Sequence, residues 1–205
     1  MIFFDFDGTL VDVWERYYRI FVAAGGLSAV EHDAYIHSKR ELVKDDLVAD
    51  RLHCTLAPAY YTEKKRLLER ADFLKLDTLL IGVDELLEFF ARYPSRILTV
   101  RRNPAAFYEQ LENLGLSSIA EKSIVLHPEH RIGKVDYITA HYGTEKNVIV
   151  GDAASEYEAS ALANTQVVLV RTGLRDPEDF PVRRNVHIAE DVVQFVSQYK
   201  NEPYL

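Results

Sequence analysis

Two hydrophobic rhythms alternate along the second half of the chain. Short runs rich in Val, Ile and Leu predict strands at 96–100, 123–126, 147–151, 166–170 and 185–188. Apolar residues three and four positions apart predict helices at 83–93, 104–116, 135–143, 156–164 and 190–199. Strands that alternate with helices in this way indicate βα units on a parallel sheet.

The first part of the chain has a different pattern. Residues 2–6 form one apolar run that predicts a buried strand, and no strand pattern appears from Val13 to about Leu80. That stretch instead carries apolar residues at helical spacing over 13–24, 27–52 and 58–76. We therefore expect an α/β core, formed by the first strand and everything after about residue 82, with a helical insert of about 70 residues.

Composition narrows the class of protein. The 205 residues suffice for one medium domain with an insert, and a net charge of −8 argues against a nucleic-acid-binding domain. Cys54 is the single cysteine, which excludes an internal disulfide and fits a reducing compartment. No apolar stretch approaches the length of about 18 residues that spans a bilayer. We expect a cytoplasmic protein without membrane or nucleic-acid partners.

Polar side chains follow several predicted strands at the points where those strands end. In an open parallel sheet, ligands bind at the carboxyl ends of the strands, so these positions are candidates for a site. The candidates are Asp5, Asp7, Gly8 and Thr9 after the first strand, Thr99 and Arg101 at the second, Lys134 after the third, and Asp152 and Glu156 after the fourth.

This set of residue types suits phosphate chemistry with a metal ion. Carboxylates without a His or Cys cluster suit a hard cation such as Mg²⁺, and a lysine and a hydroxyl can hold phosphoryl oxygens. A shielded carboxylate can attack phosphorus, while a second carboxyl protonates the leaving alcohol and later activates water. Each residue alone also has an ordinary structural interpretation, because Asp-Gly is a common turn and acids often begin helices. Their joint occurrence at successive strand ends favours the site.

The sequences "DFDGTLVD" (5–12) and "VIVGDAASE" (148–156), with Thr99 and Lys134 between them, resemble the four motifs of the haloacid dehalogenase-like hydrolase superfamily. The resemblance implies Asp5 as the nucleophile and Asp7 as the general acid and base. It also implies Mg²⁺ bound by Asp5, by the backbone carbonyl of Asp7 and by Asp152, with Thr99 and Lys134 on the phosphoryl group.

The resemblance extends to the fold and to supporting residues. It implies a Rossmann-like doubly wound parallel sheet of residues 1–12 and 82–205 with an inserted helical cap domain at 13–81, as in phosphoglycolate phosphatase and β-phosphoglucomutase relatives. Glu156 stands where the family often has Asp, and we expect it to orient the lysine or a metal-bound water. Gly8 and Arg101 are further candidates for substrate binding, although adjacent arginines such as Arg101 and Arg102 are more typical of a solvated turn.

We expect a Mg²⁺-dependent phosphatase that hydrolyses a small phosphorylated metabolite through a phospho-aspartyl intermediate. The name-giving dehalogenases lack the second aspartate of the first motif, so Asp7 favours phosphoryl transfer. A phosphomutase on the same scaffold and a non-catalytic binding protein are the alternatives, and the chain would be a monomer or a homodimer. Four cap residues were weighed as substrate contacts, although their pattern is more typical of a solvated helix face: His37, Lys39, Arg40 and Lys44.

Overall fold

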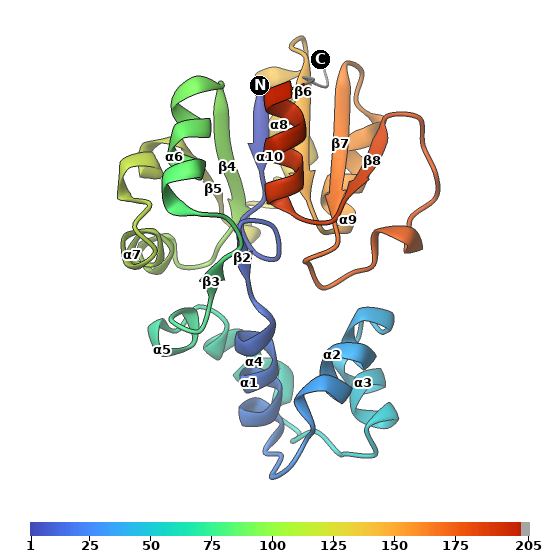
Figure 1. The fold of residues 1–205 in the computed structure, drawn as a ribbon. Helices are drawn as coiled ribbons and strands as arrows, with labels where there is room; N and C mark the ends of the chain where they lie inside the picture. Colours follow the sequence, from blue (N-terminus) through green and yellow to red (C-terminus); the bar gives the residue numbers. More distant parts are fainter. Residues whose placement is uncertain (202–205) are drawn as a thin grey trace.

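A six-stranded parallel sheet forms one body of the molecule in the computed structural model, which describes residues 1–201 (Figure 1). Its order is β5-β4-β1-β6-β7-β8, so β1 lies in the middle of the sheet. The strands are β1 (Ile2–Phe4), β4 (Ser95–Val100), β5 (Ser123–Leu126), β6 (Asn147–Gly151), β7 (Thr165–Val170) and β8 (Val186–Ala189). All six match strands predicted from the sequence.

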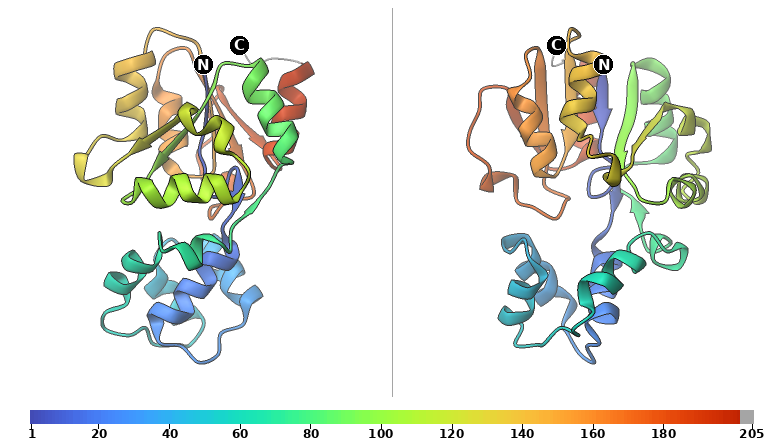
Figure 2. Two further views of the ribbon diagram at one scale, coloured as in Figure 1. Left: turned by 90° about the vertical axis from the view of Figure 1, so that its left-hand side faces the viewer. Right: turned by 180° about the vertical axis from the view of Figure 1, so that it is seen from behind.

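Helices cover both faces of this sheet, which confirms the predicted doubly wound α/β fold (Figures 1 and 2). Ile2 and Phe4 of β1 point to one apolar cluster and Phe3 to the other, as the alternation of side chains along a strand requires. The first cluster includes residues of α6 (Val83–Arg92), α7 (Pro104–Asn113) and α10 (Val192–Asn201). The second includes residues of α8 (Lys134–Tyr142) and α9 (Ala154–Glu158).

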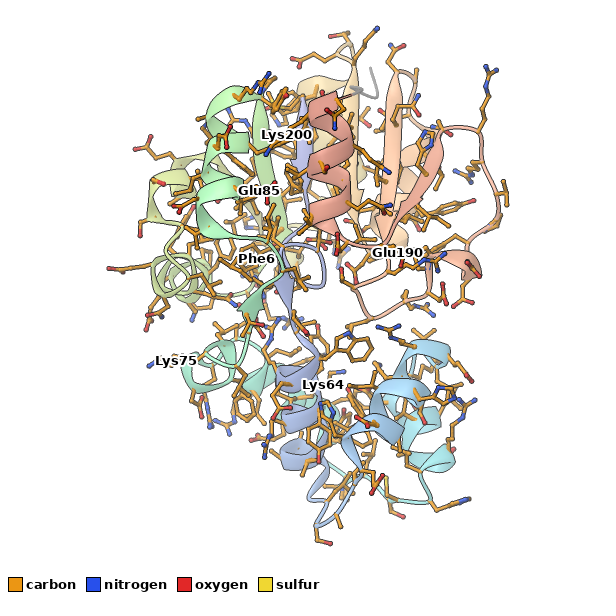
Figure 3. All side chains as sticks on the ribbon, viewed as in Figure 1. Phe6, Lys64, Lys75, Glu85, Glu190 and Lys200 are labelled. Carbon is orange, nitrogen blue, oxygen red and sulfur yellow. The ribbon has the colours of Figure 1, made fainter. Side chains whose placement is uncertain are left out.

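Contacts between helices complete the packing on these faces. The ring of Phe4 stacks on Phe90 of α6 and meets Phe195 of α10 edge-on, with ring centroids 5.5 and 5.6 Å apart. At the rim, Lys200 Nζ of α10 lies 3.2 Å from Glu85 Oε1 of α6, and both are labelled in Figure 3. Within residues 1–201, no helix combines the length and the apolar character that a membrane crossing demands.

Five helices form a second body on one side of the sheet (Figures 1 and 2). They are α1 (Trp14–Gly25), α2 (His32–Glu41), α3 (Asp45–Arg51), α4 (Tyr60–Leu67) and α5 (Ala71–Leu74). These helices, which we call the cap, have an apolar cluster of their own that includes Phe21, Tyr35 and Tyr60. The helical patterns predicted over 27–52 and 58–76 are each divided between two helices. The domain limits at residues 12 and 82 stay a prediction.

A short strand, β3 (Thr78–Leu79), corrects the prediction that no strand occurs between Val13 and about Leu80, and it pairs with a second short strand just before that stretch. β2 (Val11–Asp12) and β3 (Thr78–Leu79) pair antiparallel, and Leu80 N donates to Leu10 O at 2.9 Å just beyond them. Strands of two residues are too short to carry a periodic pattern, so the sequence does not indicate them. β2 and β3 join the segment that enters the cap to the segment that leaves it. Their pairing holds the two segments together beside the end of β1.

Four short 3₁₀ helices occupy the remaining connections. They are η1 (Ser117–Lys122), η2 (Pro128–His130), η3 (Ala159–Ala161) and η4 (Pro177–Asp179). The predicted helix at 156–164 corresponds to α9, which begins two residues earlier, followed by η3. This early start places Glu156 in the first turn of α9, where its side chain faces back towards the end of β6.

Candidate active site

The first motif forms a turn at the carboxyl end of β1. Asp5 N donates to Val150 O of the neighbouring β6 at 2.8 Å, which continues the pairing of the two strands by one residue. The chain then turns, and Gly8 adopts the positive φ of 74° that glycine accepts without steric cost. Because β1 and β6 are neighbours, this turn places Asp5 beside Asp152, which follows β6.

Three carboxyl groups and one amine converge at this edge of the sheet. Asp5, Asp152 and Glu156 each offer a carboxylate oxygen within 4.8 Å of the others. Lys134 Nζ lies 2.6 Å from Asp5 Oδ1 and 2.7 Å from Glu156 Oε1. The side chains are mostly withdrawn from solvent, with Asp5 11% exposed and Lys134 8% exposed. We call these four residues the acidic centre.

Burial and the close approach of the carboxylates both shift the pKa values of the acidic centre. Burial and the neighbouring carboxylates raise the pKa of Asp5 to about 6, against the effect of Lys134. Burial, Asp5 and Glu156 raise the pKa of Asp152 well above its usual value. Although burial alone would lower the pKa of Lys134, Asp5 and Glu156 raise it, so the amine stays charged. One ammonium thus faces three acids, and an all-oxygen donor set with surplus negative charge fits a hard divalent cation.

Two glycines let the surrounding loops close on Asp152. A β-carbon on Gly8 would lie 2.7 Å from Asp152 Oδ2, and one on Gly173 would lie 1.9 Å from the same atom. Leu174 N donates to Asp152 Oδ2 at 3.0 Å, and Thr172 Oγ1 donates to Gly8 O at 2.7 Å. The carboxylate is therefore held by backbone that only glycine permits. The predicted contact between Gly8 and phosphate stays a prediction.

Asp7 points away from the acidic centre towards two arginines. Arg101 Nη2 donates to Asp7 Oδ1 at 2.6 Å, and Arg16 Nη2 lies 2.9 Å from the same oxygen. Arg16 Nε lies 3.0 Å from Asp77 Oδ1, and Gln110 Nε2 donates to Asp77 Oδ2 at 2.7 Å. We call Asp7, Arg16, Asp77 and Arg101 the arginine centre.

The two acids of the arginine centre have opposite pKa shifts, set by the arginines for Asp7 and by burial for Asp77. Although burial alone would raise the pKa of Asp7, Arg101 and Arg16 lower it to about 2. Burial raises the pKa of Asp77 to about 7, with Arg16 acting against this shift. In this arrangement Asp7 is ionised at neutral pH and Asp77 is close to half protonated.

The interpretation of Arg101 and Arg102 as a solvated turn is wrong for Arg101. Its side chain is 4% exposed, its guanidinium lies over the rings of Phe6 and Phe107, and its backbone N donates to Leu126 O at 2.8 Å. Backbone pairing thus continues one residue past the end of β4, so consecutive side chains still point in opposite directions. Arg101 therefore turns inward to Asp7, and Arg102 is exposed as expected.

Arg16 and Asp77 belong to the site region and were not predicted from the sequence. Arg16 occupies a position on the buried stripe of α1, four residues before Ile20, and its side chain is 1% exposed. A charged residue on the apolar stripe of an amphipathic helix is a signal that could have identified it. Asp77 lies in a loop after α5 and carries no comparable signal.

Thr99 lies where the sequence places it. In the register of β1 and β4, Phe4 is opposite Ile97, so Thr99 is level with Phe6 on the neighbouring strand. Its side chain is almost fully buried beside the turn that carries Asp5 and Asp7. The roles of Thr99 and Lys134 on a phosphoryl group stay predictions, as does the carbonyl of Asp7 as a metal ligand.

The cap residues weighed as substrate contacts divide into two kinds. Lys39 is buried, and its Nζ donates to Asp45 Oδ1 at 2.6 Å and to Val43 O at 2.7 Å. The expectation of a solvated position is therefore wrong for Lys39, because Asp45 at the start of α3 draws the amine inward. His37, Arg40 and Lys44 are exposed as expected.

Comparison with known proteins identifies solved structures that have a similar fold. No family model matches the sequence, and no curated protein sequence matches it. A haloacid dehalogenase-like hydrolase from Streptococcus pneumoniae is similar in structure, with a TM-score of 0.68 at 18% identity over 97% of each chain. A predicted phosphoglycolate phosphatase from Haemophilus somnus matches with a TM-score of 0.60 at 17% identity over 96% of each chain.

A protein of different named activity has the same architecture. Protein tyrosine kinase A of Mycobacterium tuberculosis matches with a TM-score of 0.66 at 19% identity, over 96% of this chain and 95% of that one. At these identities the likeness concerns the fold, and activity has to be argued from the site. The chain thus has the fold of haloacid dehalogenase-like hydrolases, as the resemblance of its motifs implies.

Proposed function

We propose that the protein is a Mg²⁺-dependent phosphatase that hydrolyses a small phosphorylated metabolite through a phospho-aspartyl intermediate on Asp5. The observation that carries the proposal is the acidic centre, in which Lys134 bridges Asp5 and Glu156 beside Asp152. Three acids with a single ammonium suit a site that binds a cation and a phosphate together. The similar fold of several phosphatases supports the same reaction class.

The donor atoms fit magnesium. The carboxylates of Asp5 and Asp152 and the backbone carbonyl of Asp7 would hold the ion, while Glu156 keeps Lys134 in place. When bound, Mg²⁺ would neutralise the acids and draw negative charge from the phosphoryl oxygens. Lys134 and Thr99 would bind further phosphoryl oxygens, so that phosphorus faces the carboxylate of Asp5.

The reaction divides into two displacements. In the first, a carboxylate oxygen of Asp5 forms a bond to phosphorus, and the bond between phosphorus and the alcohol oxygen breaks. The departing alcohol takes a proton from Asp7. In the second, water attacks the phosphorus of the acyl phosphate, Asp7 accepts the proton of that water, and phosphate and free Asp5 result.

The arginine centre determines the protonation state of Asp7, and therefore whether Asp7 is prepared to act as the acid or as the base. With Arg16 and Arg101 on Oδ1, Asp7 is ionised and ready to act as a base. Its role as an acid needs a higher pKa. A phosphate dianion that competes with Asp7 for Arg101 would raise that pKa, so substrate binding itself would prepare Asp7 to donate its proton.

The test is Mg²⁺-dependent release of phosphate from p-nitrophenyl phosphate. We expect turnover by the wild type, loss of turnover on chelation of divalent metal, and loss in Asp5→Asn. Asp33→Asn is the matched control, because Asp33 lies on the cap surface and its side chain is 97% exposed. Absence of turnover by folded wild type over a panel of phosphate esters would contradict the proposal. Phosphoryl transfer between substrates without release of phosphate would favour the phosphomutase.

A further inference from the structure

A cavity of about 180 Å³ lies between the cap and the core beside the acidic centre. Its cap side is formed by Lys39, Leu42 and Val43, and its core side by Asp152, Ala153, Leu174 and Arg175. With the phosphoryl group of a substrate at Asp5 and Asp152, the remainder of that substrate would extend into this cavity.

The core wall of this cavity is a firmly held loop. Figures 1 and 2 show the segment after β7 leaving the sheet in the direction of α2. Trp14 Nε1 of the cap donates to Thr172 O at 3.1 Å, and Thr172 Oγ1 donates to Gly8 O at 2.7 Å. Leu174 N donates to Asp152 Oδ2 at 3.0 Å. The backbone immediately before Arg175 is therefore fixed against both the first motif and the acidic centre.

Arg175 is the available cation of the cavity. Lys39 Nζ is already engaged by Asp45 Oδ1, 2.6 Å away, in a carboxylate that it shares with Lys64. Arg175 is half-buried, and within residues 1–201 its guanidinium has no hydrogen bond or ion pair. A half-buried guanidinium without an acidic partner on an otherwise fixed loop is a ready partner for a ligand anion.

We propose that Arg175 determines substrate specificity by binding a carboxylate on the leaving group. This inference rests on the proposed phosphatase function and adds the substrate class, a small phosphate monoester of a hydroxy acid. The apolar wall of Leu42, Val43 and Leu174 contacts the short carbon chain, and the fork of the guanidinium matches the two carboxylate oxygens. The acidic centre binds one end of the substrate and Arg175 binds the other.

A pair of substrates of equal shape tests this inference. 3-Phosphoglycerate and glycerol 3-phosphate differ by a carboxylate in place of a hydroxymethyl group. We expect wild type to prefer 3-phosphoglycerate in kcat/KM by about ten- to a hundredfold, the range of hydrogen bonds to charged groups. Arg175→Gln should remove this preference by lowering kcat/KM for 3-phosphoglycerate towards the value for glycerol 3-phosphate. Arg175→Lys should keep part of it, because it retains the charge without the fork.

Arg184→Gln is the matched control, since Arg184 is exposed on the same connection between β7 and β8. It should keep the full preference. Equal kcat/KM values for the two esters in wild type, or an equal loss for both in Arg175→Gln, would overturn the role of Arg175 and leave the phosphatase proposal standing. Absence of turnover of every ester, p-nitrophenyl phosphate included, would overturn the phosphatase proposal itself. Tighter calorimetric binding of 3-phosphoglycerate than of glycerol 3-phosphate, lost in Arg175→Gln, would then still support the carboxylate site.

Discussion

Asp5 and Asp7 are two residues apart in one turn, yet their surroundings carry opposite charge. Asp5 faces two further acids and a single ammonium, and its pKa is raised to about 6. Asp7 faces two guanidinium groups, and its pKa is lowered to about 2. This difference shows which of the two aspartates lies among charges that the chain itself does not balance. The acidic centre could bind a cation between its acids, whereas the arginine centre is close to neutral from its own residues.

The two centres also differ in the parts of the fold from which their residues come. All members of the acidic centre follow strands of the core, at β1, β5 and β6, so the sheet itself sets their positions. In the arginine centre, Arg16 comes from the first helix of the cap and Asp77 from the segment that leaves the cap. Arg16 Nη1 also donates to Leu68 O at 3.0 Å, next to the end of α4. This centre therefore ties the cap to the proposed acid–base residue.

Lys134→Met should have the largest effect, because it removes the only positive charge within the acidic centre. We expect kcat for p-nitrophenyl phosphate to fall by about a hundred- to a thousandfold, as for loss of one group that stabilises developing charge. The exposed Lys146, replaced by Met, is the control and should retain activity. A loss of less than about tenfold would show that the acidic centre does not depend on its ammonium.

Arg16→Met should mainly reduce stability. The change leaves Asp77, whose side chain is fully buried, without its guanidinium partner, and breaking a buried pair costs about 3 kcal/mol. Urea unfolding measures this loss. Arg19→Met, three residues along the same helix at an exposed pair with Glu15, should change stability by less than about 0.5 kcal/mol. Equal stability of the two variants would contradict the view that the arginine centre joins cap and core.

The pH dependence of stability should distinguish Asp5 from Asp7. Asp5 has a raised pKa, so it binds more protons when folded, and metal-free protein should lose stability as pH rises from about 4 to 6. Asp7 has a lowered pKa, so it binds fewer protons when folded. The protein should therefore lose stability as pH falls from about 4 to 2. By the size of the shifts, the change amounts to about 3 kcal/mol for Asp5 and about 2 kcal/mol for Asp7.

Urea unfolding across pH checks both slopes. Asp5→Asn should make the curve shallower between pH 4 and 6, where Asp77 and Asp152 also contribute, and Asp7→Asn should make it shallower below pH 4. Added Mg²⁺ should reverse the loss above pH 4 in wild type, because the ion binds the ionised acids. A single slope shared by both variants would show that the two aspartates are not in different surroundings.

The acidic centre was predictable because each of its members belongs to a local sequence pattern. Asp5 and Asp152 directly follow apolar strands, and ends of parallel strands meet at one edge of the sheet. The strands and most helices were predictable for the same reason, since their periodicity is local. Lys134 and Glu156 gained meaning from their order relative to these strand ends.

Asp7 and Arg101 were candidate site residues, but the contacts of the arginine centre could not be predicted, because they join distant parts of the chain. Arg101 and Asp7 are 94 positions apart, and nothing in the local sequence distinguishes Arg101 from the exposed Arg102. The pair of strands β2 and β3 likewise depends on two segments that meet only after the cap has folded. Lys39 resembled a surface residue until the structure placed Asp45 against its amine.

The most direct test of the proposed function is to identify the residue that carries the phosphoryl group. Protein quenched during turnover and reduced with borohydride converts an aspartyl phosphate to homoserine, which peptide mass spectrometry locates. We expect homoserine at position 5 in wild type, dependent on Mg²⁺ and substrate, and an unmodified peptide in Asp5→Asn. Homoserine at position 7 or 152, or release of phosphate without modification of Asp5, would contradict the assignment of Asp5 as the nucleophile.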